Sequence, residues 1–285
     1  MSIVFLNGEY LPMQEAKISP MDRGFLFGDG IYEMVPSYSG KPVGFAPHIE
    51  RMQRGLDEIG LELSMTEDDW RRVAAELIQK NGSGNLGLYL HVSRGADVKR
   101  FHAYPDNISP TIFAFAFEIA PAPIPDKNQA KAFKVHSSED LRWKRCHIKS
   151  TSLLGNVMHF QQGYDAGVHE TILYNTKGEL TEASACNVFV VKDDVVITPP
   201  LDNQLLPGIT RYMLLDILRR DGVIAVEERV ILMDEVRNAD ELWLTSSSKE
   251  IAPVIELDGK PVGNGRVGDI WQLAQTLYSA NKYNY

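Results

Sequence analysis

Pro121-Ala122-Pro123-Ile124-Pro125-Asp126 places three prolines within five residues near the middle of the chain. Proline fixes its own backbone angle and lacks an N–H donor, so this stretch cannot form a helix. Proline-rich runs of this kind act as stiff connectors. The stretch therefore predicts two domains, a smaller one over residues 1–120 and a larger one over residues 129–285, joined by a linker over residues 121–128.

Two helices are expected before the linker. The first begins at about Pro47 and ends before Gly60, because apolar residues recur there on one helical stripe. The second begins after Thr66, which stands three residues before Asp69 in the spacing of a capping box. Strands are expected on either side of an Asn7-Gly8 hairpin turn and over residues 86–92 and 111–117.

The same alternation continues after the linker, so both domains are expected to be of the α+β type. Strand patterns lie around Val135, around Ile172, over residues 188–191 and over residues 195–197. Helices are expected after Ser152, after Gly208 and over about residues 270–278. No internal repeat interrupts this pattern.

Composition favours a globular enzyme. The chain has 285 residues, of which 44% are hydrophobic and 24% charged, which is enough to form a sizeable core. Its formal net charge of -9 argues against a nucleic-acid partner or an anionic membrane surface, and no apolar run reaches the roughly 20 residues that span a bilayer. With only two cysteines, no disulfide framework is expected, and without closely spaced histidines no metal site is expected. The sequence shows no basic stretch followed by an apolar leader segment, so a cytoplasmic protein is expected.

Two stretches have the chemistry of a binding site. Leu206-Pro207-Gly208-Ile209-Thr210-Arg211 brings a glycine, a hydroxyl and free backbone N–H groups to a helix N-terminus, where an anion is stabilised. Thr181-Glu182-Ala183-Ser184-Ala185-Cys186-Asn187 places one acid and one amide just before a strand. Taken alone, the first stretch has an alternative interpretation as an ordinary glycine-led helix start. Lys149, in Cys146-His147-Ile148-Lys149-Ser150, has the alternative of being a solvated surface lysine when it is taken alone.

Taken together, six segments resemble the fold-type IV enzymes that use pyridoxal phosphate (PLP). This group contains D-amino acid aminotransferases, branched-chain aminotransferases, (R)-amine transaminases and aminodeoxychorismate lyases. The resemblance runs from about Asn7 to Gly259. The segments that carry it are Asp22 to Glu33, His48 to Arg51, Ile148 to Ser150, Thr181 to Ser184, Gly208 to Arg211 and Leu244 to Ser247.

The resemblance implies a role for each matching residue. Lys149 corresponds to the lysine that forms a Schiff base with PLP and then serves as the base. Glu182 corresponds to the carboxylate that keeps the pyridine nitrogen protonated. The implied phosphate ligands are Arg51, Ile209, Thr210, Ser246 and Ser247. Leu206 is implied to pack on the ring, and Tyr32 to lie near the imine and the substrate carboxylate.

One loop indicates which subfamily is most similar. Lys99-Arg100-Phe101-His102 stands where D-amino acid aminotransferases carry an Arg-x-His pair that reaches into the site of the neighbouring subunit. The resemblance therefore implies that Arg100 and His102 bind the substrate carboxylate across a homodimer interface. A solvated basic loop is the alternative. The tyrosine-glycine-arginine pattern of the branched-chain enzymes is not found here.

Two departures affect what can be carried over. Relatives often have a hydroxyl residue where Ala185 stands, which puts one hydrogen bond near the cofactor in doubt. Alternate strand residues share a face, so Tyr32, Met34 and Pro36 line up, and Pro36 implies a sheet edge or a bulge there. The pocket wall behind Tyr32 is therefore expected to differ from that of its relatives.

The resulting expectation is a PLP-dependent transaminase with the active site at a homodimer interface. It would move the amino group between D-amino acids, of the D-alanine and D-glutamate type, and 2-oxo acids such as 2-oxoglutarate or pyruvate by a ping-pong mechanism. The alternatives on the same fold are an (R)-amine or branched-chain transaminase and an aminodeoxychorismate lyase. A catalytically silent PLP carrier is a further alternative, although Lys149, Glu182 and Arg51 together speak against it.

Overall fold

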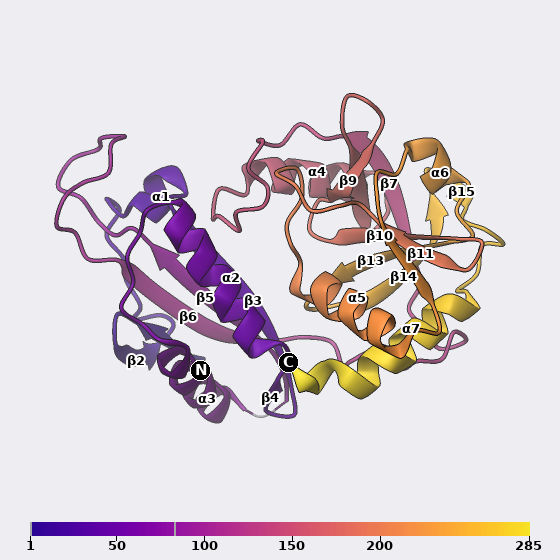
Figure 1. The fold of residues 1–285 in the computed structure, drawn as a ribbon. Coiled ribbons are helices and arrows are strands. Elements are labelled where there is room, and N and C mark those ends of the chain that lie inside the picture. Colours follow the sequence, from indigo (N-terminus) through magenta and orange to yellow (C-terminus); the bar gives the residue numbers. More distant parts are fainter. Residues whose placement is uncertain (1, 83) are drawn as a thin grey trace. The chain divides into compact units, whose positions relative to one another are not determined.

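The chain folds into two compact units. The computed structural model describes residues 2–82 and 84–285. The first unit runs to Pro121 and takes in Ile148–Leu153, whereas the second comprises Ala122–His147 and Leu154–Asn284. Figure 1 shows both units along the chain. None of the helices in the described ranges is both long and apolar enough to cross a lipid bilayer.

The first unit is built on a six-stranded antiparallel sheet in the order β2-β1-β6-β5-β3-β4. Its strands are β1 (Ile3–Leu6), β2 (Glu9–Pro12), β3 (Gly30–Tyr38), β4 (Lys41–Pro42), β5 (Asn85–Ser93) and β6 (Thr111–Glu118). Asn7 and Gly8 form the β1–β2 turn with φ angles of 49° and 97°. The hairpin predicted from this Asn-Gly pair is confirmed.

Three helices belong to the first unit: α1 (Arg23–Phe27), α2 (Phe45–Glu58) and α3 (Glu67–Asn81). Side chains of α2 and α3 form one hydrophobic core with the sheet, as Met52 of α2 and Trp70 of α3 illustrate. The capping box at the start of α3 is confirmed, since the Thr66 and Asp69 side chains each accept a hydrogen bond from the other's backbone N–H. Helix α2 begins two residues earlier than the sequence predicted.

Strand β3 sends alternate side chains to opposite faces of the sheet. Ile31 and Val35 lie in the core, whereas Tyr32 and Met34 are half-buried on the other face. Strand β3 pairs with β5 along its whole length. On its other side, only the last two residues of β3, Ser37 and Tyr38, pair with β4. Pro36 therefore lies at a sheet edge and not at a bulge.

A short segment from beyond the proline stretch returns to the first unit. The Tyr32 backbone N–H donates to the Lys149 carbonyl oxygen at 3.1 Å, and the N–H of Thr151 donates to the Gly30 carbonyl at 2.9 Å. Ile148 packs in the first core. A Cβ at Gly28 would lie 2.9 Å from the backbone of Ser152. A single division at the prolines does not account for this segment, because backbone pairing over such a separation leaves no pattern in the sequence.

The second unit contains a nine-stranded mixed sheet. Eight strands follow the order β12-β11-β10-β13-β14-β7-β8-β9, and β15 pairs with β14. The strands are β7 (Phe133–Glu139), β8 (Glu170–Tyr174), β9 (Leu180–Ala183), β10 (Asn187–Lys192), β11 (Val195–Thr198), β12 (Ala225–Glu228), β13 (Glu241–Ser246), β14 (Glu250–Leu257) and β15 (Lys260–Pro261). One core gathers side chains from both halves of this sheet, including Ile172 of β8 and Leu242 of β13.

The helices of the second unit are α4 (Leu154–Asp165), α5 (Ile209–Asp221), α6 (Met233–Arg237), α7 (Asp269–Asn281) and a 3-10 turn over Lys282–Asn284. Helix α7 is fixed to β14 because the indole N–H of Trp271 donates to the Ile251 carbonyl at 2.8 Å. The strands and helices predicted on this side of the prolines are confirmed, and with them the α+β class.

Candidate active site

Lys149 and Tyr32 lie side by side in the first unit. The extended segment that carries Lys149 forms a bridge next to β3, between Ile31 and Ser150. The Lys149 Nζ atom lies 4.1 Å from the centre of the Tyr32 ring, and that ring stacks on Tyr89 with centroids 5.5 Å apart. A half-buried amine thus lies over an aromatic face, which attracts its charged form.

Arg51 is buried in α2 and forms a two-pronged ion pair with Glu33 of β3. Its Nε and Nη2 atoms donate to the two Glu33 carboxylate oxygens, each at 2.7 Å. The ring Nδ1 of His48 lies 2.7 Å from Glu33 Oε2. This triad fixes the guanidinium of Arg51 through charge-assisted hydrogen bonds.

The environment of the triad shifts the pKa values of Glu33 and His48. Burial by itself would raise the pKa of the Glu33 carboxyl, but Arg51 and His48 outweigh that effect and hold it well below its usual value. Burial lowers the pKa of His48 against the pull of Glu33, and the charges of Arg51 and Lys149 lower it further. Lys149 is therefore close enough to this cluster to act on it. At neutral pH both shifts favour a carboxylate anion at Glu33 and a neutral imidazole at His48.

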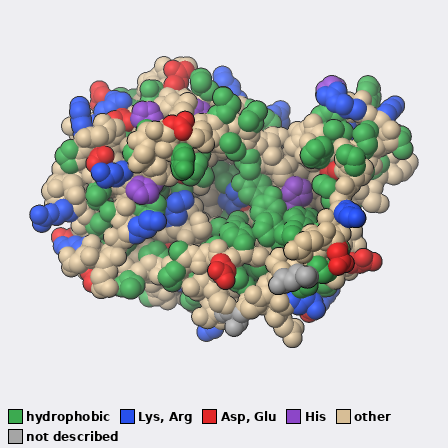
Figure 2. Space-filling view, turned by 180° about the vertical axis from the view of Figure 1, so that it is seen from behind, with side chains coloured by type: hydrophobic (Ala, Val, Ile, Leu, Met, Phe, Trp, Pro, Cys, Tyr) green, Lys and Arg blue, Asp and Glu red, His purple; other side chains and the backbone are tan. Residues whose placement is uncertain are grey.

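Arg100 and His102 are both exposed on the loop between β5 and β6, and they share one neighbour. The ring of Phe27 lies 5.0 Å from the Arg100 guanidinium and 5.3 Å from the His102 ring. Figure 2 shows lysine or arginine, histidine and hydrophobic side chains together on the loop that projects at the upper right. Within the described ranges, no carboxylate forms an ion pair with either residue. The loop thus exposes the guanidinium of Arg100 and the imidazole of His102, both of which lie against the Phe27 ring.

In the second unit, the carboxylate of Glu182 at the end of β9 is buried among donors. It accepts from Arg142 Nη1 at 2.5 Å, from the Leu206 backbone N–H at 3.0 Å and from Asn187 Nδ2 at 3.2 Å. Burial raises the pKa of Glu182 to about 7, because the cost of desolvating the charge exceeds what Arg142 and the Leu206 N–H return. A further cation beside this carboxylate would favour its anionic form at neutral pH.

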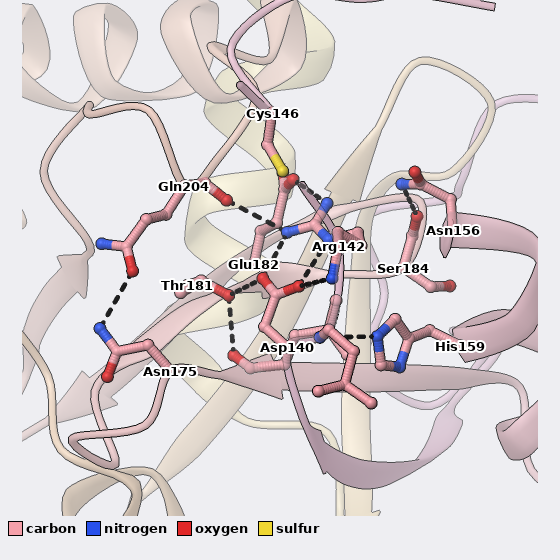
Figure 3. A network of polar contacts seen from close by, with 12 residues as sticks. Asp140, Arg142, Cys146, Asn156, His159, Asn175, Thr181, Glu182, Ser184 and Gln204 are labelled. Atoms are coloured by element: carbon pink, nitrogen blue, oxygen red, sulfur yellow. Dashed lines mark hydrogen bonds and ion pairs between the residues drawn. The ribbon is translucent and has the colours of Figure 1, made fainter. Parts of the chain in front are cut away.

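Arg142 joins Glu182 to a second carboxylate. Its Nη2 atom donates to Asp140 Oδ2 at 2.8 Å and to the Gln204 carbonyl at 3.1 Å. The hydroxyl of Thr181 donates to the same Asp140 oxygen at 3.0 Å. Figure 3 shows Arg142 reaching both acids from one side. Although burial would lower the pKa of Arg142, its two carboxylate partners raise it, so the guanidinium remains charged.

The N-terminus of α5 lies next to this carboxylate. Gly208 is the N-cap residue, and no side chain satisfies the first-turn N–H groups of α5. The Asn187 amide donates to the Leu206 carbonyl at 2.8 Å as well as to Glu182. A Cβ at position 208 would lie 2.0 Å from Asn187 Oδ1, so only glycine fits there. The predicted glycine-led helix start therefore exists, with Ile209 and Thr210 in its first turn.

The end of β13 supplies hydroxyl groups close to the same place. Thr245 lies opposite Asn187 in the β10–β13 register, and Ser246 and Ser247 follow it. Among the described residues, the hydroxyls of Thr245 and Ser246 are buried without a nitrogen or oxygen partner. The Ser246 hydroxyl has the thiol of Cys186 as a neighbour. Buried hydroxyls are normally satisfied, so these two have hydrogen-bonding capacity left.

Comparison with known proteins places the chain in a family. Residues 30–257 match the family model described as amino-transferase class IV. The chain belongs to the class IV aminotransferases. This aminotransferase is 39% identical to a D-alanine aminotransferase of Staphylococcus haemolyticus, over 99% of its own length and 98% of the relative's. It is 36% identical to a D-alanine aminotransferase of Bacillus licheniformis, over 96% and 94% of the two chains.

Solved structures of the same fold cover nearly the whole aminotransferase. A branched-chain amino acid aminotransferase of Escherichia coli superposes with a TM-score of 0.90 at 24% identity, covering 99% of this chain and 94% of the other. The PLP-bound form of a hypothetical aminotransferase of Mycobacterium tuberculosis gives a TM-score of 0.84 at 20% identity, covering 99% of each. The predicted fold-type IV architecture is confirmed, and the enzyme is a PLP-dependent aminotransferase.

The residues of the two units fit this cofactor. The first unit offers the half-buried amine of Lys149 and the fixed guanidinium of Arg51. The second offers the carboxylate of Glu182, a helix N-terminus without a side-chain cap and unsatisfied hydroxyls. These are the groups that an aldehyde, a pyridine nitrogen and a phosphate require.

Sequence reasoning missed the residues that hold these groups in place. Glu33 and His48 stand inside quoted motifs, but nothing in their spacing showed that they would clamp Arg51. Arg142 and Asn187 were given no role either. Arg142 is separated from Glu182 by 40 residues, and a single sequence contains no signal for such a pairing.

Proposed function

We propose that this enzyme is a D-amino acid transaminase. It moves the amino group of D-alanine or D-glutamate to 2-oxo acids such as 2-oxoglutarate and pyruvate, returning to its starting form after each pair of half-reactions. Identity of 36% to 39% with D-alanine aminotransferases over nearly the full chain supports the substrate class. The observation that carries the proposal is the exposed pair Arg100 and His102, gathered on the single ring of Phe27.

The proposed cofactor ligands are Lys149 and Arg51 in the first unit and Glu182, Leu206, Ile209, Thr210, Ser246 and Ser247 in the second. When bound, PLP supplies an aldehyde that takes up the amino group and a ring that withdraws electrons from the substrate Cα. Lys149 would hold the cofactor until the substrate amine displaces it, and its freed Nζ would then remove the proton from that Cα. Glu182 stabilises a protonated ring nitrogen, and Leu206 packs against the ring. Arg51, Ile209, Thr210, Ser246 and Ser247 bind the phosphate.

The substrate carboxylate is bound by Tyr32 of one subunit and by Arg100 and His102 of its partner in a homodimer. A guanidinium can meet a carboxylate with two parallel hydrogen bonds, and the imidazole adds a donor. Helix α4 supports the dimer, because its apolar side chains are exposed at helical spacing: Leu154, Val157, Met158 and Tyr164 are 73%, 57%, 61% and 69% exposed. An apolar stripe of this kind is usually covered by a protein partner.

The half-reaction tests the substrate class directly. D-Alanine, L-alanine, L-leucine and a simple (R)-amine are each added to the PLP-loaded enzyme, and the visible absorption of the bound cofactor is followed. The proposal expects rapid loss of this absorption with D-alanine and its recovery when 2-oxoglutarate is added. A response to L-leucine without one to D-alanine contradicts it. A lyase would release its product without transferring the amino group, so its absorption would not cycle between the amino acid and the oxo acid.

Mixing an inactive variant with one that binds D-alanine weakly tests the shared site at a low D-alanine concentration. Lys149→Ala subunits lack the amine, and Arg100→Ala subunits lack the proposed carboxylate ligand. A mixed dimer contains one site in which both residues are present, so activity on D-alanine should reappear at up to about half the wild-type value per mixed dimer. If no activity returns although mass measurement shows mixed dimers, the arginine acts within its own subunit.

A further inference from the structure

A second arginine holds the loop that carries Arg100 and His102. Arg23 begins helix α1 and is only 3% exposed. Its Nη1 atom donates to the carbonyl oxygens of Phe101 at 2.6 Å and Ala103 at 3.3 Å, and its Nη2 atom donates to that of His102 at 3.2 Å. One buried guanidinium therefore binds three consecutive carbonyl groups.

The remaining side of Arg23 is fixed by Asp29. The Arg23 Nε atom donates to Asp29 Oδ2 at 2.8 Å, and Arg94 binds both oxygens of the same carboxylate. Asp29 lies in the turn between α1 and β3, so it is anchored to the rigid sheet. The guanidinium plane of Arg23 is thus set before it reaches the loop, which is an arrangement that arginine makes well and lysine does not.

The loop has little other support for its backbone. Within the part of the chain that the structure describes, the main chain of residues 99–106 makes no hydrogen bond besides those to Arg23. A loop without main-chain bonds samples many conformations, and ordering it when substrate binds costs free energy. Arg23 removes much of this cost in advance.

We infer that Arg23 is a positioning residue for substrate recognition. It turns the carbonyls of residues 101–103 inward, so that the side chains on either side of Phe101 project together over Phe27 and can meet one carboxylate. This inference rests on the proposed function, because it assigns Arg23 an effect that reaches the substrate through Arg100 and His102. Arg23 itself touches neither the substrate nor the cofactor.

The variant that tests it is Arg23→Lys, which keeps the charge but cannot reach three carbonyls. We expect the KM for D-alanine to rise about tenfold with kcat changed less than twofold. The inhibition constant of propionate, a carboxylate without an amino group, should rise by the same factor. For an amine that lacks a carboxylate and that the enzyme turns over, the KM should stay at the wild-type value. A general loss of structure would not discriminate between these ligands.

Two further variants separate the possible outcomes. Lys99→Ala removes a charge from the same loop without touching the three carbonyls, and it should behave like wild type. Arg100→Ala tests the proposed carboxylate site by itself. If Arg100→Ala raises the KM for D-alanine and Arg23→Lys does not, the inference is overturned and the proposed function stands. If Arg100→Ala has no effect, the proposed carboxylate site is wrong and the inference falls with it.

A double variant tests the route of the effect. Arg23→Lys combined with Arg100→Ala should be no worse than Arg100→Ala alone, because both act on one interaction. If the two substitutions raise the KM independently, so that their factors multiply in the double variant, a positioning role is contradicted. Should Arg23→Lys fail to fold, Asp29→Asn weakens the hold on Arg23 and should give the same carboxylate-specific pattern at about threefold. The absence of that pattern in folded Asp29→Asn also overturns the inference.

Discussion

Replacing Glu33 by glutamine should strongly destabilise the first unit. The Glu33 carboxylate is fully buried and receives three contacts at 2.7 Å, two from Arg51 and one from His48. Glutamine keeps one acceptor oxygen. Its NH₂ group, however, must face a donor of Arg51 or His48.

The size of the effect follows from these contacts. Removing one partner of a buried ion pair costs about 3–5 kcal/mol, because the other charge remains buried without compensation. Since glutamine retains one acceptor, we take the lower end, about 3 kcal/mol. For a protein of this size each kcal/mol shifts Tm by roughly 2–4 °C, so the cofactor-free variant should melt about 6–12 °C below wild type.

Thermal unfolding of the cofactor-free protein, followed by circular dichroism, measures this shift. Glu50→Gln is the matched control, because Glu50 lies on α2 beside Arg51 but is 67% exposed in its pair with Arg54. Exposed pairs contribute at most about 1 kcal/mol, so the control should melt within about 2 °C of wild type. Inorganic phosphate should raise the Tm of Glu33→Gln more than that of wild type, since Arg51 then lacks its carboxylate.

The pH dependence provides a second signature. The pKa of Glu33 is lowered in the folded protein from an ordinary value of 4.5, so its stabilisation is present above about pH 4.5 and is lost as the pH falls below it. The variant should lack this loss. The pKa of His48 is lowered as well, so protonation of the unfolded chain below about pH 6.5 destabilises both proteins. A shift in Tm below 2 °C, or the same acid loss in both proteins, would refute the reasoning.

Two other substitutions test the proposed cofactor ligands. Glu182→Gln should retain PLP but lower kcat by at least ten- to hundredfold, because a charge-assisted hydrogen bond of about 1.5–3 kcal/mol is lost; unchanged turnover at saturating PLP would make Glu182 purely structural. Arg51→Ala should release PLP during dialysis faster than wild type, as judged by residual visible absorption, because the phosphate loses its guanidinium; equal retention would remove Arg51 from the phosphate site.

Local patterns predicted much of the fold. Helix α3 follows from Thr66 and Asp69, whose side chains satisfy the first backbone N–H groups wherever that spacing precedes a helical stripe. The β1–β2 hairpin follows from Asn7 and Gly8, which tolerate the positive φ angles of the turn. Each of these signals acts over only a few residues, so the sequence alone is enough to find them.

Contacts between distant segments could not be predicted in this way. The return of Ile148–Leu153 to the first unit depends on pairing with β3, more than a hundred residues earlier. The clamp of Arg23 on residues 101–103 uses backbone carbonyls, which every residue has, so it leaves no mark in the sequence. The motifs therefore indicated which residues to consider, whereas the neighbours that orient them became visible only in three dimensions.

The central claim, that Lys149 carries PLP, is tested most directly by chemical fixation. The PLP-loaded enzyme is reduced with borohydride and digested, and the modified peptide is sequenced by mass spectrometry. Lys249 is the competing amine by position, since it is half-buried with its Nζ atom 3.8 Å from the Cys186 sulfur, but its raised pKa makes it the poorer nucleophile. The account predicts the modification on Lys149, and none in Lys149→Ala. Modification of Lys249 or any other lysine in the wild-type protein would contradict it.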